Sequence, residues 1–498
     1  MYEASQLQVE ELQGKVLELS HQLSMIKKMI FGSRSERYIP CGPDVVQHTL
    51  FNQDAAVKAP IVETQKISYE KKKALPAESK EHPGRMKLPA HLRRETIVVE
   101  PDEDVSGCRK IGEEITEILE CTLGEFYVKR IIRPKYAMKV NDPEAECDTR
   151  VIVAGLPERP LEKCMAGINL LAQIIIDKYA DHLPVNRQMQ RFSRSGVLIP
   201  ITTLTGWISA TCGVLAPLGE ALTRQVLQSG YLHADETGIK VLDKDKKGST
   251  HRGWYWVYQD NRKGIVFFDY QPSRNKDGPD MVLRDFKGYL QTDGYETYTH
   301  FDDVKGITQL NCMAHARRKF TESLDNDNQR SAYALQQIGL LYDIERKAKD
   351  WSVEERLEIR QQEAVPILKK LGKWMEEQYL QVPPKSTIAL ALAYSIKRWN
   401  KLGLYATDGV LAIDNNAVER SIRSLAVGRK NYMFCGSHEA AKRAGMLYSL
   451  IGTCKLHQVN PQEWLVNVLT RISSHPINRI DELLPHIWSK QRSEVKIS

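Results

Sequence analysis

Three acidic residues, Asp235, Asp293 and Glu419, have the sequence context of metal ligands. Asp235 and Asp293 each end a short extended segment, and Glu419 lies in the first turns of a helix that Asp414 or Asn415 can cap. Carboxylate oxygens suit hard ions such as Mg²⁺ and Mn²⁺, and two such ions, about 3.5–4 Å apart, assist in-line displacement at phosphorus. We therefore interpret the three acids as a candidate catalytic site for two divalent ions.

Basic residues follow the glutamate, and they leave two interpretations open. Arg423 lies four residues after Glu419, so the two side chains could form an ordinary helical ion pair worth roughly 0.2–0.5 kcal/mol. Alternatively, Arg423, Arg429 and Lys430 could anchor DNA phosphates. A single exposed Asp or Glu is usually a solvated surface residue, so the assignment depends on the elements that position the acids.

The order of the predicted elements explains how two of the acids could meet. A meander of three extended segments is followed by a helical stretch and two further extended segments, at 231–237, 253–258, 264–270, 279–286, 288–295 and 306–312. This is the order of a ribonuclease-H-like mixed sheet, in which the first and fourth strands are neighbours. Asp235 and Asp293 would then face one point.

The N-terminal residues have the pattern of a coiled coil. Apolar residues alternate spacings of three and four at Val9, Leu12, Val16, Leu19, Leu23, Ile26 and Ile30. This pattern predicts a leucine-zipper-like segment over 1–37 that pairs two copies of the chain, although a helix packed on its own chain would show the same periodicity. Residues 38–94, with many prolines and a run of lysines, are predicted to be a partly disordered linker whose basic residues either contact DNA or are solvated.

Two further regions precede the acids. Alternating residues at 96–99 and 126–132 predict a small β-rich module over 95–160. Helical periodicity over 161–228, interrupted at Gly196, is shaped like a helix-turn-helix flanked by Arg187 and Arg191, although a plain helical hairpin has the same pattern.

Bulk properties are compatible with a DNA-binding protein. The 498 residues carry a net charge of +7, which favours a polyanionic partner. The nine cysteines include no C-x-x-C pair, and no apolar run reaches membrane-spanning length. We expect a cytoplasmic protein of several domains with no membrane contact.

Several motifs are more specific than these patterns. They are His233-Ala234-Asp235-Glu236-Thr237, Gln291-Thr292-Asp293-Gly294-Tyr295, the segment Cys312 to Phe320, and Asp414 to Arg420 continuing to Asn431. Through them, and over nearly its whole length, the chain resembles the insertion-sequence-66 transposase family, whose catalytic core is of the Asp-Asp-Glu type. The resemblance implies a metal-bound triad at Asp235, Asp293 and Glu419, with 57 residues between the first two and 125 between the last two.

The resemblance also implies a domain plan and further site residues. A core over 229–450 would contain a helical insertion at about 325–405, and a C-terminal family module would follow at 451–498. Basic residues of the motifs and of the helical region are predicted to bind DNA: Arg187, Arg191, Arg317, Arg318, Lys319, Arg420, Arg423, Arg429 and Lys430. Cys312 and His315 match a family motif, and we interpret them as supporting residues because a soft Cys and a His suit zinc better than magnesium.

One departure concerns zinc. The family's second segment commonly carries paired cysteines, whereas this chain has only Cys108 and Cys147 where pairs would stand. The β-rich module therefore resembles a degenerate zinc-finger segment and leaves zinc binding open.

The sequence thus predicts a multidomain α/β protein that acts as the transposase of a bacterial insertion sequence. It would cut double-stranded DNA at the element ends and join the freed 3′-OH to target DNA, as a dimer or larger assembly, with accessory proteins of the same element as further partners. Two alternatives use the same residues: a metal-dependent nuclease without strand transfer, and a catalytically silent DNA-binding protein. A coiled-coil scaffold would leave the acids unexplained.

Overall fold

The computed structural model describes residues 88–106, 108–122, 125–139, 149–243 and 248–497. Every described residue belongs to one unit of the chain, Gly84–Ser498. The predicted coiled coil and nearly all of the predicted linker lie outside the described residues, so both stay predictions.

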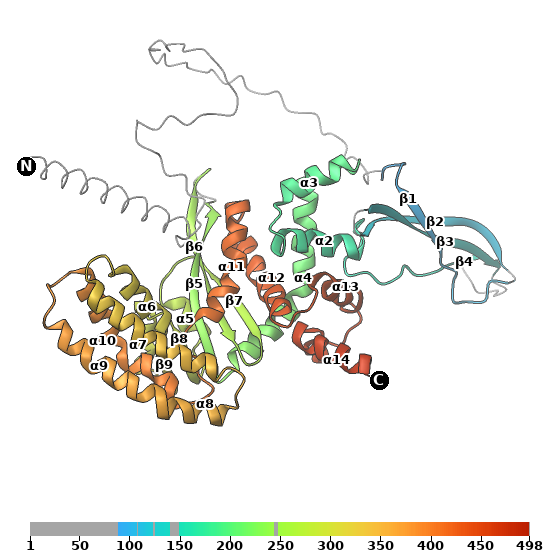
Figure 1. Ribbon diagram of the computed structural model, residues 1–498. Helices are drawn as coiled ribbons and strands as arrows, with labels where there is room; N and C mark the ends of the chain where they lie inside the picture. The colour runs from blue at the N-terminus through green and yellow to red at the C-terminus, as the bar shows by residue number, and fades with distance from the viewer. Residues whose placement is uncertain (1–87, 107, 123–124, 140–148, 244–247, 498) are drawn as a thin grey trace, which may run out of the picture. The chain divides into compact units, whose positions relative to one another are not determined.

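The first sheet is built around one long strand, β3. Its four strands are β1 (Arg93–Val98), β2 (Arg109–Thr122), β3 (Glu125–Lys139) and β4 (Thr149–Val153). Strand β3 pairs in parallel with β1 and antiparallel with β2 and β4. In the sheet labelled β1 to β4 in Figure 1, Val128 and Ile131 of β3 lie three residues apart, so they point to opposite faces, and both are buried. Ile115 of β2 is half exposed.

Three helices follow the first sheet: α2 (Ile168–Tyr179), α3 (Val185–Arg194) and α4 (Ile201–Leu227). Gly196 turns the chain between α3 and α4 with a φ of +74°, and a Cβ atom there would lie 2.5 Å from the His91 ring. Helix α4 is long and apolar enough to span a membrane by length and composition alone. It packs against α2, α12 and β7, however, and this identifies it as a core helix of the fold.

The second sheet contains the segments that carry two of the acids. Its strands are β5 (Tyr231–Leu242), β6 (Thr250–Asp260), β7 (Ile265–Gln271), β8 (Gly288–Thr292) and β9 (Ile307–Asn311). They lie in the order β7-β6-β5-β8-β9, and the short helix α5 (Asp277–Val282) and the 3₁₀ turn η1 (Glu296–Asp303) connect the later strands. The predicted pairing of the first and fourth strands is confirmed, because β5 and β8 pair in parallel from Tyr231–Tyr289 to His233–Gln291.

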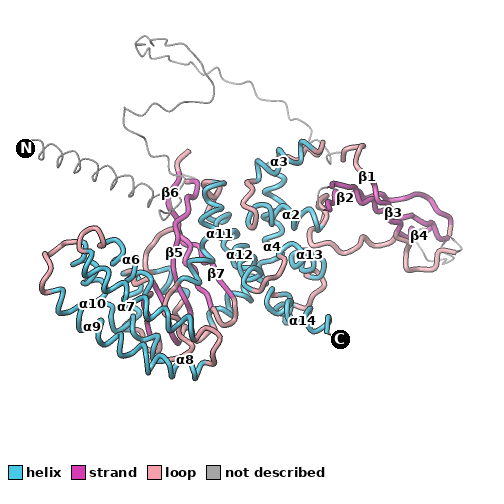
Figure 2. The backbone as a smooth tube through the Cα atoms, viewed as in Figure 1, coloured by secondary structure: helices cyan, strands magenta, loops and turns pink. Residues whose placement is uncertain are grey.

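Helices pack against this sheet from two groups (Figures 1 and 2). The first group is α6 (Met313–Glu322), α7 (Asn328–Lys347), α8 (Val353–Ile359), the π-helical turn η2 (Arg360–Ala364), α9 (Val365–Tyr379), α10 (Thr387–Gly403) and η3 (Leu404–Thr407). It forms a core of its own that includes Leu310 of β9 and Phe320 of α6.

The second group contacts β5 and β7. Its members are α11 (Asn416–Tyr432), α12 (His438–Leu456), α13 (Pro461–Arg471), η4 (Ile477–Leu483) and α14 (Pro485–Ile497). Helix α11 contacts β5, and α12 contacts β7. The main core therefore joins the second sheet, with its fully buried Trp256 and Tyr258, to these helices and to α2 and α4.

Candidate active site

Asp235 on β5 and Asp293 in the turn after β8 occupy equivalent positions relative to the parallel pairing of these strands. Each lies two residues beyond the paired residues His233 and Gln291, so the register brings both acids to the same end of the sheet. The strand before Asp235 is buried, and Asp235 itself is half-buried. Asp293 Oδ1 accepts the backbone N–H of Tyr295 at 2.8 Å, in a turn made possible by Gly294, whose φ is +85°.

Helix α10 fixes the backbone of this turn. The Tyr394 hydroxyl donates to the carbonyl oxygen of Asp293 at 2.8 Å, and Arg398 donates to the carbonyl of Gly294 at 3.0 Å. A Cβ atom on Gly294 would lie 2.6 Å from Arg398 Nε, so the close approach of α10 requires glycine at this position. The position of Asp293 thus depends on a helix about 100 residues later in the chain.

Glu419 lies in the first turn of α11, where Asn415 attaches the helix to β5. Asn415 is fully buried; its Nδ2 donates to the Ala234 carbonyl at 2.9 Å, and its Oδ1 lies 3.0 Å from His233 Nδ1. The sequence allowed Asn415 to cap the helix, but its side chain makes no capping hydrogen bond. Asp414 Oδ1 instead accepts the backbone N–H of Asn416 at 3.1 Å. Glu419 is consequently brought near the part of β5 that carries Asp235. Asp235 does not end its strand as predicted, because β5 continues to Leu242.

The pKa of Asp235 reflects both its burial and the charges of neighbouring carboxyl groups. Burial raises the pKa of Asp235 to about 8, and the negative charges of Glu236, Asp293 and Glu419 add to that shift. His315 lies near two of these charges: burial lowers its pKa, and Asp293 and Glu419 oppose that change. The structure therefore brings all three predicted acids into one electrostatic neighbourhood, beside His315.

Glu419 and His315 each present an unpaired atom that could contribute to a metal site. Glu419 Oε1 and His315 Nδ1 lie 3.8 Å apart, and each is buried without a hydrogen-bond partner within the described structure. A bound cation stabilises carboxylates that lie near one another, and carboxylate oxygens are the ligands that Mg²⁺ and Mn²⁺ prefer.

Cys312 lies in the same group, but its environment is that of a supporting residue. The ligand atoms of Cys312, His315 and Glu419 all lie within 4.8 Å of one another, which is the arrangement of a metal site. Yet Cys312 is fully buried, its sulfur accepts the Asn415 N–H at 3.1 Å, and burial raises the pKa of its thiol to about 12. A thiol that stays protonated is a poor metal ligand, so we interpret Cys312 as part of the attachment of α11.

The raised pKa of Asp235 leads to a prediction for the metal-free protein. An unfolded Asp titrates near pH 3.9, whereas Asp235 in the fold titrates at about 8, so unfolding releases a proton between these pH values and stability falls as pH rises. Asp235→Asn removes this effect. We expect the variant to gain about 1–2 kcal/mol in the free energy of unfolding at pH 8.5, less than the whole shift implies because Asp235 is partly solvated. The gain should be smaller at pH 5.

Urea unfolding in EDTA checks this expectation, with Mg²⁺ added in a parallel series. Mg²⁺ should stabilise the wild type by mass action and the variant less. A metal-free variant that is no more stable than the wild type at pH 8.5 would show that repulsion around Asp235 is absent.

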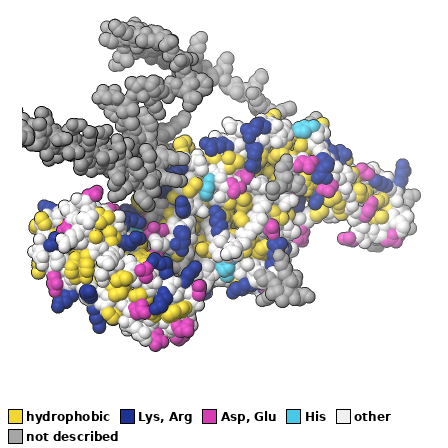
Figure 3. All heavy atoms as spheres, in the orientation of Figure 1, with side chains coloured by type: hydrophobic (Ala, Val, Ile, Leu, Met, Phe, Trp, Pro, Cys, Tyr) yellow, Lys and Arg dark blue, Asp and Glu magenta, His cyan; other side chains and the backbone are white. Residues whose placement is uncertain are grey.

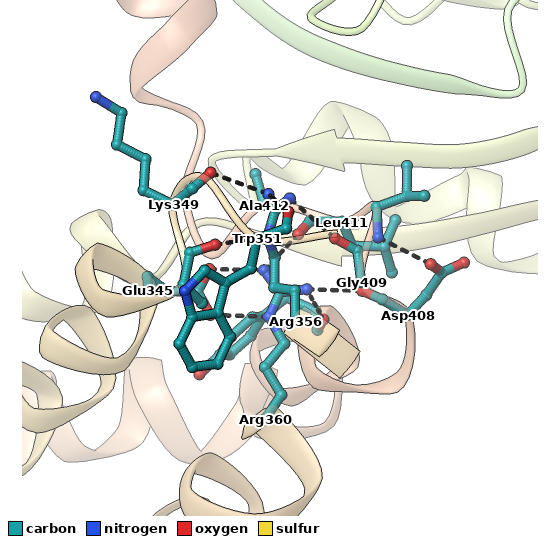
Figure 4. Close-up of polar contacts among 12 residues, drawn as sticks. Glu345, Lys349, Trp351, Arg356, Arg360, Asp408, Gly409, Leu411 and Ala412 are labelled. Atoms are coloured by element: carbon teal, nitrogen blue, oxygen red, sulfur yellow. Dashed lines mark hydrogen bonds and ion pairs between the residues drawn. The ribbon is translucent and has the colours of Figure 1, made fainter. Parts of the chain in front are cut away.

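The loop before Glu419 is held by a buried arginine (Figure 4). Arg360 is only 1% exposed, and its Nε and Nη2 donate to the two carboxylate oxygens of Glu345 at 2.8 and 2.6 Å. The remaining N–H groups donate to the carbonyls of Tyr405, Asp408 and Leu411 at 2.7–2.9 Å. All five N–H donors of the guanidinium are therefore used.

The same loop is held at neighbouring points. Arg356, one turn before Arg360, donates to the Gly409 carbonyl at 3.1 Å (Figure 4). The Tyr231 hydroxyl accepts the Ala412 N–H at 3.0 Å, and Gln291 Nε2 donates to the Ala412 carbonyl at 2.9 Å. The helices between β9 and α11 thus position two of the acids, Asp293 through α10 and Glu419 through this loop.

The predicted DNA-binding residues divide into two groups. Exposed side chains that lack an ion pair within the described structure are Arg187, Arg317, Arg318, Arg420, Arg423 and Lys430. The others contact the protein: Arg191 pairs with Asp177, Lys319 with Glu322, and Arg429 donates to Thr237 Oγ1 and to the Gly238 carbonyl. The helical ion pair of Glu419 with Arg423, left open by the sequence, does not form.

Comparisons with known proteins identify the family of this chain. The family model described as "Transposase IS66 family" matches residues 163–443, the "IS66 C-terminal element" matches 449–486, and "Transposase C of IS166 homeodomain" matches 18–97. Similar proteins from Sinorhizobium fredii (strain NBRC 101917 / NGR234) include the uncharacterized protein y4hP, 32% identical over 83% of this chain and 78% of the relative. The uncharacterized protein y4jD is 30% identical over 96% of both chains.

Proposed function

Because the chain belongs to the IS66 family of transposases, we propose that it cleaves DNA at the ends of an insertion sequence and joins the freed ends to target DNA. The observation that carries this proposal is the convergence of Asp235, Asp293 and Glu419 at one end of the second sheet. Three carboxylates brought together by rigid elements are what metal-dependent displacement at phosphorus requires.

We interpret the second sheet as the centre of a ribonuclease-H-like core. The strand order β7-β6-β5-β8-β9, with β6 antiparallel to both of its neighbours and β5, β8 and β9 parallel, supports this interpretation. So does the placement of one acid on each of β5, α11 and the turn that follows β8.

Asp235, Asp293 and Glu419 would hold the divalent ions. When bound, these ions would lower the pKa of an attacking water and stabilise the leaving oxygen. The protein's own residues set the geometry: Asn415 fixes the start of α11, and Tyr394 fixes the turn that carries Asp293. In cleavage, a water oxygen attacks the phosphorus and a 3′-OH leaves; in joining, that 3′-OH attacks a target phosphodiester and a new 3′-OH leaves.

DNA would approach over the exposed basic residues. Figure 3 shows Lys and Arg side chains in the regions of α3 and α11, and the exposed residues there include Arg187, Arg420 and Arg423. Such side chains bind phosphates and give salt-dependent affinity. We propose that helices α3 and α4 and the N-terminal segment recognise element ends, and that two copies of the chain act together, with accessory proteins of the element as further partners. The homeodomain named in the description of the N-terminal family model supports a DNA partner.

Cleavage and joining of labelled element-end DNA test the proposal. The wild-type chain, with any accessory proteins encoded beside it, is incubated with Mg²⁺, Mn²⁺ or EDTA. We expect metal-dependent products in which the 3′ end of the element is linked to target DNA. Cleavage without joining would favour a nuclease, and binding without either reaction would favour a silent DNA-binding protein.

A further inference from the structure

Guanidinium and aromatic groups alternate along β6 and the segments beside it. The Cζ atom of Arg252 lies 4.5 Å from the centre of the Trp254 ring. Arg274 Cζ lies 4.6 Å from the centre of the same ring and 3.7 Å from the centre of the Tyr295 ring. We call these four residues, Arg252, Trp254, Arg274 and Tyr295, the arginine–aromatic column.

One end of the arginine–aromatic column adjoins the candidate active site. Arg274 forms an ion pair with Glu236, the residue after Asp235, and its Nε lies 3.2 Å from Glu236 Oε1. The backbone N–H of Tyr295 donates to Asp293 Oδ1 at 2.8 Å. The other end follows β6 outward, where Trp254 is paired with Gly238 and Arg252 with Lys240 across the β5–β6 ladder.

The positive charge of the column is only partly neutralised. Glu236 is a buried partner for Arg274, but Arg252 is exposed and has no carboxylate partner among residues that the structure describes. Arg429 of α11 adds a third guanidinium, which donates to the Thr237 hydroxyl and the Gly238 carbonyl. Burial lowers the pKa of Arg429, and the charge of Arg252 contributes to that shift. Of these three arginines only Arg274 has a carboxylate partner within the described structure, and an anionic ligand would complete the site.

The column also fixes the orientation of Arg252. A Cβ atom on Gly238 would lie 2.6 Å from Arg252 Nε, so glycine leaves the space that the guanidinium occupies beside β5. Stacking on Trp254 restricts the plane of the guanidinium and leaves its N–H edge available. A preorganised guanidinium of this kind matches the two oxygens of a phosphate group, and loses less entropy on binding than a free surface side chain.

We propose that Arg252, held by Trp254, binds a backbone phosphate of the DNA strand that passes the acids, with Arg274 beside it. This inference rests on the proposed function and adds a contact on β6 to the basic residues of α6 and α11. The contact would place the DNA relative to Asp235 and Asp293, because Arg274 and Tyr295 are attached to the segments that carry these acids.

Salt-dependent DNA binding tests the proposal with the full-length chain and fluorescently labelled element-end duplex. We expect Arg252→Gln to weaken binding about five- to tenfold at low salt, and to reduce the slope of log affinity against log salt by about 0.9, the change for one lost phosphate contact. Arg252→Lys keeps the charge without the planar fork, so it should keep the slope and lose part of the affinity. The urea midpoint should not change for either variant.

Lys370→Gln is the matched control, because Lys370 is an exposed cation of α9, a helix that packs on α7, α10 and η2. It should leave affinity and slope unchanged. An Arg252→Gln protein with wild-type affinity and slope would overturn the inference and leave the proposed function standing, provided that the wild type cleaves element ends. A wild type that binds no DNA at any salt concentration would overturn both.

Discussion

Glu419→Gln is expected to lower both end cleavage and strand transfer by at least about a thousandfold, a loss of roughly 4 kcal/mol of transition-state stabilisation. The amide keeps the size of the side chain but removes the negative charge that would hold a divalent ion. The contacts that attach α11 are made by Asn415, so the helix should keep its place and DNA binding should change less than about threefold. Single-turnover rates and DNA affinity, measured on the same preparation, check the expectation.

Glu439→Gln is a matched control. Both glutamates lie in the first turn of a helix, but Glu439 belongs to α12, its side chain is 65% exposed, and it pairs with Lys442 at 3.0 Å. Both rates should stay within about twofold of the wild type, because an exposed ion pair of this kind is worth less than about 1 kcal/mol. A Glu419→Gln protein that retains a tenth of wild-type activity would remove Glu419 from the site.

Arg360→Met is expected to cost about 3–5 kcal/mol in the free energy of unfolding. Methionine fills part of the space but leaves the Glu345 carboxylate buried without its partner. The carbonyls of Tyr405, Asp408 and Leu411 also lose their donors. Because these carbonyls belong to the loop that leads to Glu419, strand transfer should fall more than DNA binding does. Urea unfolding at pH 7 measures the stability change.

Two further variants distinguish the buried ion pair from an ordinary one. Arg346→Met removes an arginine of α7 that is 73% exposed and paired with Asp343, and it should cost less than about 0.5 kcal/mol. Adding Glu345→Leu to Arg360→Met removes the unpaired carboxylate and should recover part of the loss. If Arg360→Met cost less than about 1 kcal/mol, the loop would be held by other contacts.

The part of the site that depends on local pattern could be predicted from the sequence. The extended segments around Asp235 and Asp293 are marked by alternating residues and by Gly turns, and the chirality and order of such strands leave few arrangements. The pairing of β5 with β8 followed from that order. The helical context of Glu419 was also visible, since its helix begins at a cap sequence.

The residues that hold the acids in place could not be predicted in the same way. Asn415 contacts Ala234 across 181 residues, and Arg360 contacts carbonyls 45–51 residues away. A single buried polar residue has no periodicity, and its partners are backbone atoms, which leave no signal in the sequence. The arginine–aromatic column could not be predicted either, because it joins residues from β6, from the segment after β7 and from the turn after β8.

Helix α4 illustrates how packing overrides a local signal. The predicted helical region 161–228 contains Gly213 and Pro217, and both residue types usually interrupt helices. The structure continues α4 to Leu227 through Pro217, because Leu215, Leu218 and Leu222 lie fully buried in the main core. The burial of these side chains offsets the hydrogen bond that proline removes.

The most direct test of the three-acid site is the joining of a pre-cleaved element end, carrying a free 3′-OH, to a supercoiled target plasmid in Mg²⁺. Because the 3′-OH is already free, this assay measures strand transfer without the cleavage step. We expect joined product from the wild type, none in EDTA, and none from Asp293→Asn at equal DNA occupancy. Undiminished joining by Asp293→Asn would contradict the assignment of Asp293 and, with it, the catalytic site described for this protein.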